Sequence, residues 1–106
     1  MKRFKLSESG ARGWFIGDFD RAVHRTQDFE VNYQTTLQGY HQPHVHKLVT
    51  EIQLVTRGVM IMNGERFETG DIVVLEPGEV GDASFPEDCD TITIKFPSIP
   101  DDKYLV

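Results

Sequence analysis

Three of the four histidines of the chain lie within six residues, at His41, His44 and His46. Side chains two residues apart in a β-strand point to the same face, so His44 and His46 would project into one space. Two imidazoles at this spacing can bind one divalent metal ion through their ring nitrogens. Glu51 follows five residues later. Its carboxylate would complete a metal-binding set of two histidines and one carboxylate.

The position of Glu51 in the sequence sets a condition on this site. Glu51 has the opposite parity from the two histidines, so an unbroken strand would place it on the other face of the sheet. A turn or bulge within residues 47–49 would bring Glu51 back to the histidine side. Gln53 would then follow Glu51 on the inward face and offer a substrate both a donor and an acceptor. The alternative is that His44 and His46 lie in a surface loop and bind no metal.

The elements that would position these residues follow from a hydrophobic pattern with a period of two residues, which is typical of β-strands. Residues 29–37 alternate most clearly and predict a half-buried strand. Its apolar face would carry Phe29, Val31, Tyr33, Thr35 and Leu37. Further strands are expected at residues 14–16, 50–56, 59–62, 65–67, 72–75 and 91–96. About seven or eight short strands without a long helix predict an all-β sandwich or barrel.

Three local features refine this prediction. Asn63-Gly64 lies between two apolar runs and predicts a hairpin, because a type I′ turn needs positive φ at both central positions. The four consecutive apolar residues 72–75 suit a strand that is buried on both faces. Residues 18–28 form the one segment that could hold a helical turn.

The length of 106 residues is that of one domain. Within residues 1–106 we expect an N-terminal extension with strands over residues 1–28 and a barrel core over residues 29–96. Residues 97–106 would form a C-terminal tail that lies at a sheet edge or contacts a partner. Cys89 is the only cysteine, which excludes an intramolecular disulfide.

The charge of the chain bears on its partners. Eleven Lys and Arg against seventeen Asp and Glu give a net charge of −6, and no basic cluster is present. Binding to nucleic acid or to an anionic membrane surface requires such clusters, so the sequence argues against both partners. No apolar run is long enough for a membrane span and no secretory signal is present, so we expect a cytoplasmic protein.

The segment that contains the histidines matches a known pattern. Residues 39–58 resemble the first motif of the cupin superfamily, which places H-x-H, a glutamate and a glycine at set distances after a leading glycine. The H-x-H pair, the four-residue gap to Glu51 and the six-residue gap to Gly58 all match this motif. Gly39 stands one residue closer to the histidines than the motif has it.

A second segment strengthens the resemblance. Residues 70–82 match the glycines of the second cupin motif, with Glu76 at the position of its first proline. The resemblance implies a double-stranded β-helix, or jelly-roll barrel, with a metal in its mouth, in a homodimer.

The second motif also departs from the family pattern. Gly81 stands where the third metal-binding histidine of the family belongs, and Phe85 stands at its asparagine position. Asp82 lies one residue beyond and could supply an oxygen ligand instead, which would make the set His44, His46, Glu51 and Asp82. Such a set suits Mn, Fe, Ni or Zn. The alternative for Asp82 is a solvated acidic residue of the loop.

Three further side chains bear on the site. His41 would line the barrel mouth as a substrate-binding or acid–base group, or it is an exposed loop histidine. Tyr33 would contact substrate, or it is part of the apolar core. Lys95 lies on the side of its strand opposite Ile92 and Ile94 and is expected to face solvent.

These residues support one leading function and two alternatives. The leading hypothesis is a metal-binding cupin that acts on a sugar or a carboxylic acid by isomerase- or oxygenase-type chemistry, with Glu51 as metal ligand or as the group that transfers a proton. The second is a non-catalytic module that binds a small ligand through a degenerate metal site. The third is a sensor or interaction domain that acts through its dimer surface.

Overall fold

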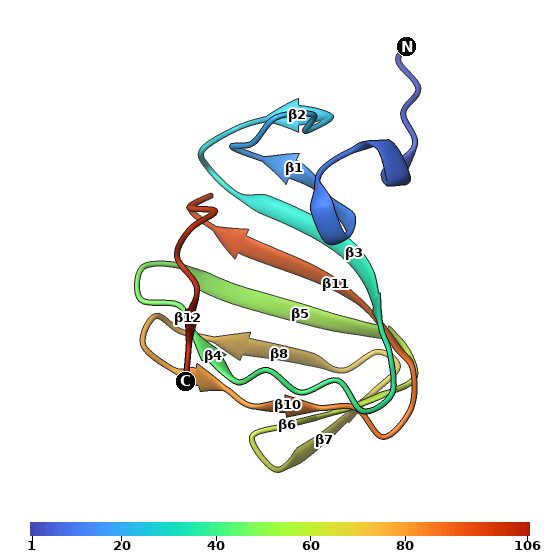
Figure 1. Cartoon of the computed structure of the whole chain (residues 1–106), viewed down its shortest axis with the longest axis vertical. Helices are drawn as coiled ribbons and strands as arrows, with labels where there is room; N and C mark the ends of the chain where they lie inside the picture. Colours follow the sequence, from blue (N-terminus) through green and yellow to red (C-terminus); the bar gives the residue numbers. More distant parts are fainter.

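The computed structural model describes all residues, 1–106, and shows two layers of strands that enclose one interior (Figure 1). The all-β, double-stranded β-helix fold expected from the sequence is confirmed. There are twelve strands rather than seven or eight, because several of them are only two residues long. No helix of the structure is long and apolar enough to cross a membrane.

The larger layer is a six-stranded sheet with the order β2-β1-β3-β11-β5-β8. Its strands are β1 (Trp14–Gly17), β2 (His24–Arg25), β3 (Glu30–Thr36), β5 (Thr50–Arg57), β8 (Ile72–Leu75) and β11 (Cys89–Phe96). Two short 3₁₀ helices, η1 (Leu6–Glu8) and η2 (Ala11–Gly13), precede β1. The long strands β3, β11 and β5 pair antiparallel and form the wall that carries most of the site.

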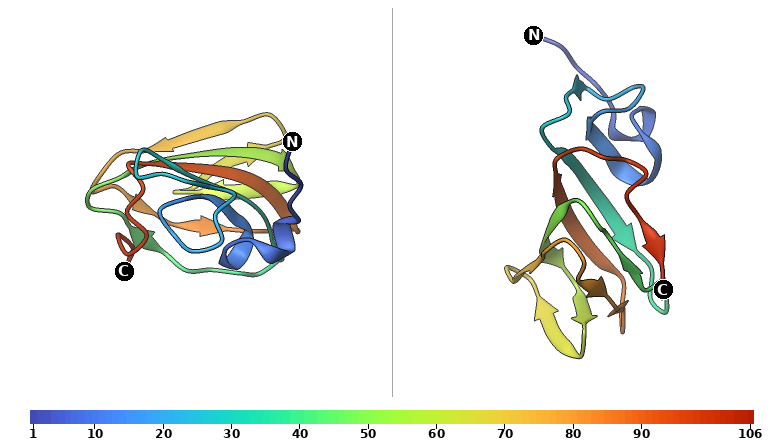
Figure 2. Two further views of the ribbon diagram at one scale, coloured as in Figure 1. Left: turned by 90° about the horizontal axis from the view of Figure 1, so that it is seen from above. Right: turned by 90° about the vertical axis from the view of Figure 1, so that its left-hand side faces the viewer.

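The opposite layer consists of two three-stranded sheets, with the orders β10-β6-β7 and β12-β4-β9. Their strands are β4 (His44–Val45), β6 (Val59–Met62), β7 (Glu65–Glu68), β9 (Val80–Gly81), β10 (Ala83–Ser84) and β12 (Tyr104–Leu105). Figure 2 shows the two layers on either side of the interior. The C-terminal tail ends in β12, at the edge of its sheet, as one of the two sequence-based alternatives had it.

The hairpin between β6 and β7 forms as predicted. Asn63 and Gly64 both have positive φ, 51° and 83°, and Met62 pairs with Glu65 across the turn. An apolar cluster lies next to this hairpin and between β5, β6, β8 and β11. Its buried members are Val55, Met60, Met62, Leu75 and Cys89.

The faces of β3 and β11 are the reverse of the sequence-based expectation. Glu30 and Asn32 are 3% and 2% exposed, whereas Tyr33 on the supposed core face is 40% exposed. Lys95 was expected in solvent and is 7% exposed. The physical reason is that these strands bound a polar cavity, so their polar side chains point inward and their apolar ones outward.

Two further expectations are wrong. The segment 72–75 is not buried on both faces, because Ile72 and Val74 are 58% and 48% exposed. Only one face of β8 meets the interior, since no layer covers the other side of the six-stranded sheet. Residues 18–28 contain turns and β2 but no helix, and the helical turns lie earlier, in η1 and η2.

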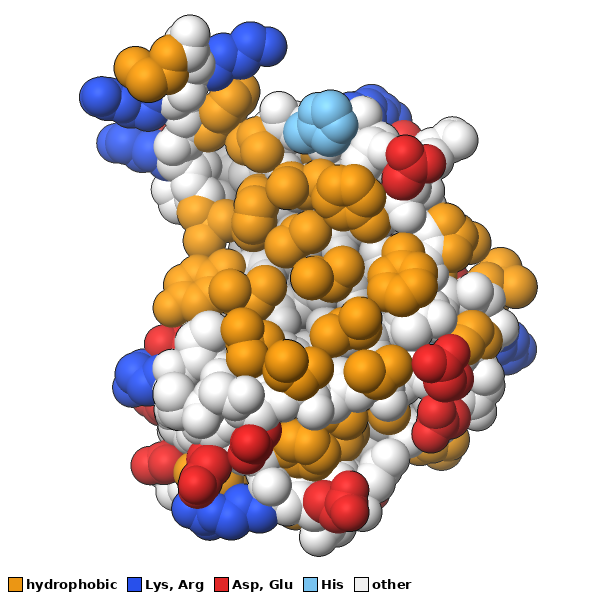
Figure 3. Space-filling view, turned by 180° about the vertical axis from the view of Figure 1, so that it is seen from behind, with side chains coloured by type: hydrophobic (Ala, Val, Ile, Leu, Met, Phe, Trp, Pro, Cys, Tyr) orange, Lys and Arg blue, Asp and Glu red, His pale blue; other side chains and the backbone are white.

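The outer side of the six-stranded sheet is therefore apolar. Two rows of side chains cross β3, β11, β5 and β8 in register, one of Val31, Ile94, Ile52 and Val74 and one of Tyr33, Ile92, Leu54 and Ile72. Figure 3 shows this face as a broad hydrophobic surface with charged side chains at its margin. We refer to these eight residues as the outer apolar face.

Candidate functional site

A turn between β4 and β5 settles the position of Glu51. The chain leaves β4 at Val45, turns at residues 47–48 and enters β5 at Thr50, so Glu51 points into the interior as the histidines do. The buried carboxylate of Asp102 holds this turn. It accepts backbone N–H bonds from residues 47, 48 and 49, at 3.1, 2.8 and 3.0 Å.

The side chains of His44, His46 and Glu51 meet in the interior. One potential ligand atom from each lies within 4.8 Å of the others. His46 and Glu51 are both 4% exposed, and His44 is half-buried. The two imidazole rings stand edge to face at 78°, with centroids 4.9 Å apart. We refer to these three residues as the His-His-Glu cluster.

Backbone carbonyls fix the protonation of both histidines. His44 donates from Nδ1 to the carbonyl oxygen of Gln42 at 3.1 Å, and His46 donates from Nδ1 to the carbonyl oxygen of Asp102. A carbonyl can only accept, so Nδ1 carries the proton in each ring. This leaves Nε2 of each ring as the atom that can bind a metal, in the arrangement that carbonyl partners impose on metal-binding histidines.

The contact between His46 and Glu51 tests whether a metal fits. His46 Nε2 is buried without a hydrogen-bond partner and lies 2.6 Å from Glu51 Oε2. With the single ring proton of His46 on Nδ1, Nε2 and the carboxylate oxygen both present lone pairs, and their repulsion at this distance calls for a second proton or a cation between them. A divalent cation bound by both atoms would remove the repulsion. The residues present therefore fit a metal ion.

The pKa values of the cluster favour the same state. Burial alone would raise the pKa of Glu51, but its close contact with His46 and the hydrogen bond from Gln53 hold it below its usual range. Burial lowers the pKa of His44. An ionised carboxylate beside a neutral imidazole is the form in which these groups bind metals.

Gly81 pairs with His44 across β4 and β9. A Cβ atom built on Gly81 would lie 2.9 Å from Leu75 Cδ1 and 3.7 Å from Met62 Sδ, so a side chain there would point into the interior. Leu75 and Met62 of the apolar cluster pack against this position instead of a third histidine. The structure thus brings together three potential metal ligands and no fourth one from this position.

Asp82 does not join the His-His-Glu cluster. Its Oδ1 lies 2.6 Å from His41 Nε2, and both side chains are 54% exposed. The structure thus brings the predicted site residues His41 and Asp82 together, but it places neither of them in the His-His-Glu cluster. The backbone N–H of Asp82 is also engaged outside the interior, where it donates to Asn63 Oδ1 at 2.8 Å.

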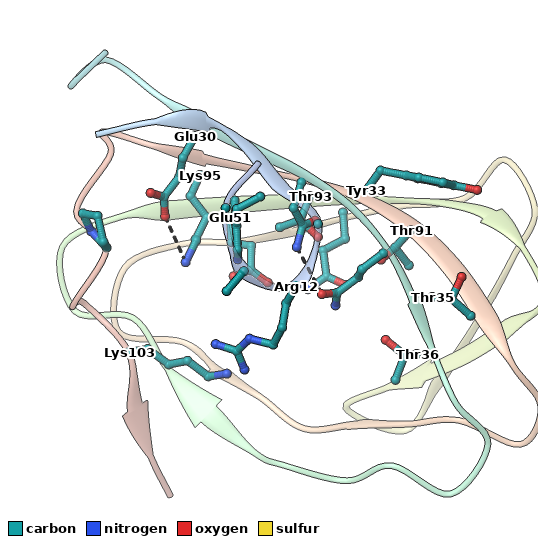
Figure 4. A pocket seen from close by; sticks show the side chains of 18 of the residues that line it. Arg12, Glu30, Tyr33, Thr35, Thr36, Glu51, Thr91, Thr93, Lys95 and Lys103 are labelled. Atoms are coloured by element: carbon teal, nitrogen blue, oxygen red, sulfur yellow. Dashed lines mark hydrogen bonds and ion pairs between the residues drawn. The ribbon is translucent and has the colours of Figure 1, made fainter. Parts of the chain in front are cut away.

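An open cavity of about 1270 Å³ surrounds the cluster. Gln53 lies inside it and donates to Glu51 Oε1. The rest of the inner wall comes from β3 and β11, and Figure 4 shows several of these side chains directed inward. They are Glu30, Asn32, Gln34, Thr91, Thr93 and Lys95. Tyr33 borders the same cavity, but its side chain points away from the cluster and its hydroxyl contacts Asp90 at 3.4 Å.

Sequence reasoning missed several of these wall residues. Lys95 Nζ lies 3.1 Å from Glu30 Oε1, and Ser98 Oγ donates to Glu30 Oε2 at 2.9 Å. Asn32 donates to Gln34 at 3.2 Å, while Asn32 Oδ1 is buried without a partner. The signal that could have found them is the polar half of the alternation in residues 29–37, which is as regular as the apolar half.

Solved structures with the same fold are known, although no protein-family model and no curated protein matches this sequence. An uncharacterized conserved protein with a double-stranded β-helix domain from Klebsiella pneumoniae is 22% identical, with 92% of this chain and 85% of that chain covered and a TM-score of 0.67. An RmlC-like cupin from Shewanella frigidimarina is 15% identical, with 72% of each chain covered and a TM-score of 0.65.

A third structure aligns over the whole chain. Pac13 of Streptomyces, a nucleoside dehydratase, is 14% identical, with 100% of this chain and 91% of that chain covered and a TM-score of 0.71. A point variant of Pac13 has also been solved with uridine. At these identities the likeness shows the fold, which is that of the cupins.

Proposed function

We propose that this chain is a metal-dependent cupin that acts on a small polar molecule, a sugar or a carboxylic acid, by isomerase- or oxygenase-type chemistry. The observation that carries the proposal is the buried, unpaired Nε2 of His46 facing the carboxylate of Glu51. The open cavity with its polar wall supports a small hydroxylated ligand, because such ligands need many hydrogen-bonding groups around them.

His44, His46 and Glu51 would hold the metal, for which Mn, Fe, Ni and Zn are the candidates. When bound, such an ion polarises a carbonyl or hydroxyl oxygen of the substrate. The protein holds both imidazoles in the ligand tautomer and directs Glu51 through the hydrogen bond from Gln53. Glu51 is the catalytic residue of the proposal, as metal ligand or as the group that moves a proton.

The polar wall would orient the substrate. Asn32 Oδ1 is buried without a donor, so a substrate hydroxyl can satisfy it. Thr91 and Thr93 lie on the same inner face of β11 and are 3% and 5% exposed. Burial of these groups keeps water away from the bound molecule, which strengthens each polar contact with it.

A non-catalytic binding module is the second candidate, and the glycine at position 81 favours it. The protein supplies no third imidazole, and the apolar side chains of Leu75 and Met62 lie where one would point. In this case the cavity would bind its ligand with little or no metal, and a change of His44 to alanine would leave ligand binding intact.

Elemental analysis tests the two candidates. The protein is purified without a metal-affinity column beside a His44→Ala/His46→Ala variant. Near-stoichiometric metal in the wild type and none in the variant is the expected result. No metal, even after incubation with Mn, Fe(II), Ni and Zn, would favour the binding module. Once the metal is known, Glu51→Gln should abolish turnover of a substrate without unfolding the protein.

We further propose that the chain forms a homodimer through the outer apolar face. Eight apolar side chains in two registered rows are too many to leave in water without association, and a second copy offers the same flat surface. Sedimentation equilibrium should give twice the chain mass of 12.1 kDa. A monomer at micromolar concentration would contradict this interface.

A further inference from the structure

Two basic side chains at the cavity have no anionic partner. Arg12 of η2 and Lys103 of the C-terminal tail both line the cavity that contains the His-His-Glu cluster. The ion pairs of the structure include neither of them. Lys103 Nζ donates only to the neutral amide of Gln42, at 3.0 Å. Two cations in one cavity that form no ion pair with its carboxylates are therefore available to a ligand.

The two cationic groups converge on one region. Figure 4 shows the guanidinium of Arg12 and the ammonium of Lys103 extending toward the same part of the cavity. Burial lowers the pKa of Lys103, the charges of Arg12 and Lys95 lower it further, and the carboxylate of Glu51 offsets only part of this effect. An anion bound between these groups would relieve their repulsion.

The backbone at Arg12 is shaped to direct this side chain. Arg12 has φ 51° and ψ 38°, in the left-handed region that residues with a Cβ seldom adopt. The next residue, Gly13, has φ 82°, and a Cβ there would lie 2.0 Å from the carbonyl oxygen of Tyr33. The tight contact with β3 thus forces the turn, and the turn carries Arg12 over the cavity mouth. Strain of this kind concentrates at functional sites.

The charge of the cavity differs from that of the whole chain. The protein has a net charge of −6, yet the lining of the cavity carries four basic side chains against three carboxylates, namely Arg12, Arg21, Lys95 and Lys103 against Asp20, Glu30 and Glu51. Glu30 neutralises Lys95 at 3.1 Å, and Glu51 belongs to the His-His-Glu cluster. A divalent ion at that cluster would make the cavity more positive still. An acidic protein that gathers cations in its one large cavity is suited to an anionic ligand.

We propose that Arg12 and Lys103 bind an anionic group, a carboxylate or a phosphate, on the small molecule that the cavity receives, while the polar wall binds its hydroxyl groups. This assignment rests on the proposed function only in taking the cavity as the substrate site. The guanidinium can bind two oxygens of either anion side by side, and the ammonium adds a third contact. The anionic group would thereby fix one end of the substrate within the cavity.

The experiment titrates metal-free protein with inorganic phosphate and, separately, with acetate, and follows amide chemical shifts by NMR. We expect at least one anion to bind, with shifts centred on residues 11–13, Gln42 and Lys103. Preference for phosphate would assign a phosphorylated substrate, and preference for acetate a carboxylate. An Arg12→Met/Lys103→Met variant should weaken binding at least tenfold. A Lys2→Met/Arg66→Met variant, which has the same net charge and changes only exposed residues outside the cavity, should bind as the wild type does.

The outcomes separate this inference from the proposed function. A folded Arg12→Met/Lys103→Met variant that binds the anions as tightly as the wild type, or a wild type that binds neither anion, would overturn the anion site. The His44→Ala/His46→Ala variant should lose metal and keep anion binding. A wild type that binds no metal but binds the anion through Arg12 and Lys103 would overturn the metal-dependent function and leave the anion site standing. The spectra also show whether each variant is folded, and Arg12→Lys/Lys103→Arg should restore binding in part.

Discussion

The two faces of the six-stranded sheet use the same strands for opposite purposes. On the inner face, Glu30, Lys95 and Glu51 stand side by side on β3, β11 and β5. On the outer face, the row one residue along is wholly apolar and includes Ile94 and Ile52. The backbone hydrogen bonds are shared by both faces, so the difference lies in the side chains alone. The face toward the cavity is the one specialised for chemistry, and the face toward solvent carries the apolar surface.

Buried polar atoms without hydrogen-bond partners mark the inner face as a site. Lys95 and Glu30 are paired, and Ser98 completes the network around Glu30. Asn32 Oδ1 and His46 Nε2 are buried and unpaired. Each such atom costs about 1–3 kcal/mol of folding free energy, which a ligand or metal can recover. The outer face has no comparable buried polar groups, so it offers a partner apolar surface to bury rather than specific hydrogen bonds.

The largest effect is expected from breaking the inner ion pair. Lys95→Met would leave the carboxylate of Glu30 buried at 3% exposure without its cation. Removing one partner of a buried pair costs about 3–5 kcal/mol. Urea unfolding of the variant should show this loss in the free energy of unfolding.

A surface pair provides the control for Lys95→Met. Arg66 and Glu68 lie 3.3 Å apart with both side chains 62% exposed. Arg66→Met should cost less than about 1 kcal/mol, because water screens exposed pairs. Equal losses in the two variants would mean that the inner face is as solvated as the surface, and the contrast between the faces would fail.

Removal of metal should have the next largest effect. An ion held by the His-His-Glu cluster binds only the folded chain, and at about 100 times its dissociation constant it contributes about 2.7 kcal/mol. Excess chelator should therefore lower the melting temperature of metal-loaded wild type in calorimetry. The His44→Ala/His46→Ala variant should show no change with chelator. An unchanged wild type would count against a metal at the inner face.

How far the sequence predicts this molecule depends on which face is considered. Period-two alternation located most strands, and Asn63-Gly64 located the hairpin, because both signals are local. Alternation does not state which half of the pattern faces inward, so Glu30 and Lys95 were assigned to the wrong side. In a barrel with a polar cavity the polar side chains point inward and the apolar ones outward, and only the closed fold shows that this is the case here.

The site was predictable to the extent that it is local in sequence. His44, His46 and Glu51 lie within eight residues, and the structure brings them together. Asp102 lies 56 residues from His46, and no pattern in the tail indicates that its carbonyl would orient that ring. Arg12 and Lys103 likewise come from the two ends of the chain, and only the closed barrel places both at one cavity.

Asp102→Asn should have a smaller effect on stability and should act on the inner face indirectly, through the turn at residues 47–49. An amide offers one acceptor oxygen where the carboxylate uses both, so at least one of the three backbone bonds to residues 47–49 is lost. We expect a loss of about 1–3 kcal/mol in unfolding free energy. Because the turn positions His46 and Glu51, metal affinity measured by competition with a chromogenic chelator should fall about 10–100-fold.

A second carboxylate that caps a turn serves as the control for Asp102→Asn. Asp71 accepts the backbone N–H of Glu68 at 2.9 Å in an exposed turn. Asp71→Asn should leave metal affinity unchanged. If both variants bind metal equally well, Asp102 supports the chain locally and does not position the site.

The smallest effect on the monomer is expected from the outer face. Val74→Lys places a charge on a side chain that is already 48% exposed, so the free energy of unfolding should change by less than about 0.5 kcal/mol. Val73→Lys changes the neighbouring residue, whose side chain packs against the apolar cluster. A lysine there must leave the interior or bury its charge, so the loss should be several times larger. Both are measured by urea unfolding at concentrations low enough to keep the chain monomeric.

The same pair of variants connects stability to assembly. Val74→Lys should lower the mass found by sedimentation to that of one chain, because each copy would bring a lysine into the apolar contact. A variant that stays dimeric would place the dimer contact elsewhere than on β8. Equal destabilisation of the monomer by Val74→Lys and Val73→Lys would instead mean that both sides of β8 are covered within one chain. The outer face of β8 would then be part of the interior, and residues 72–75 would form the strand buried on both faces that their four consecutive apolar side chains predict.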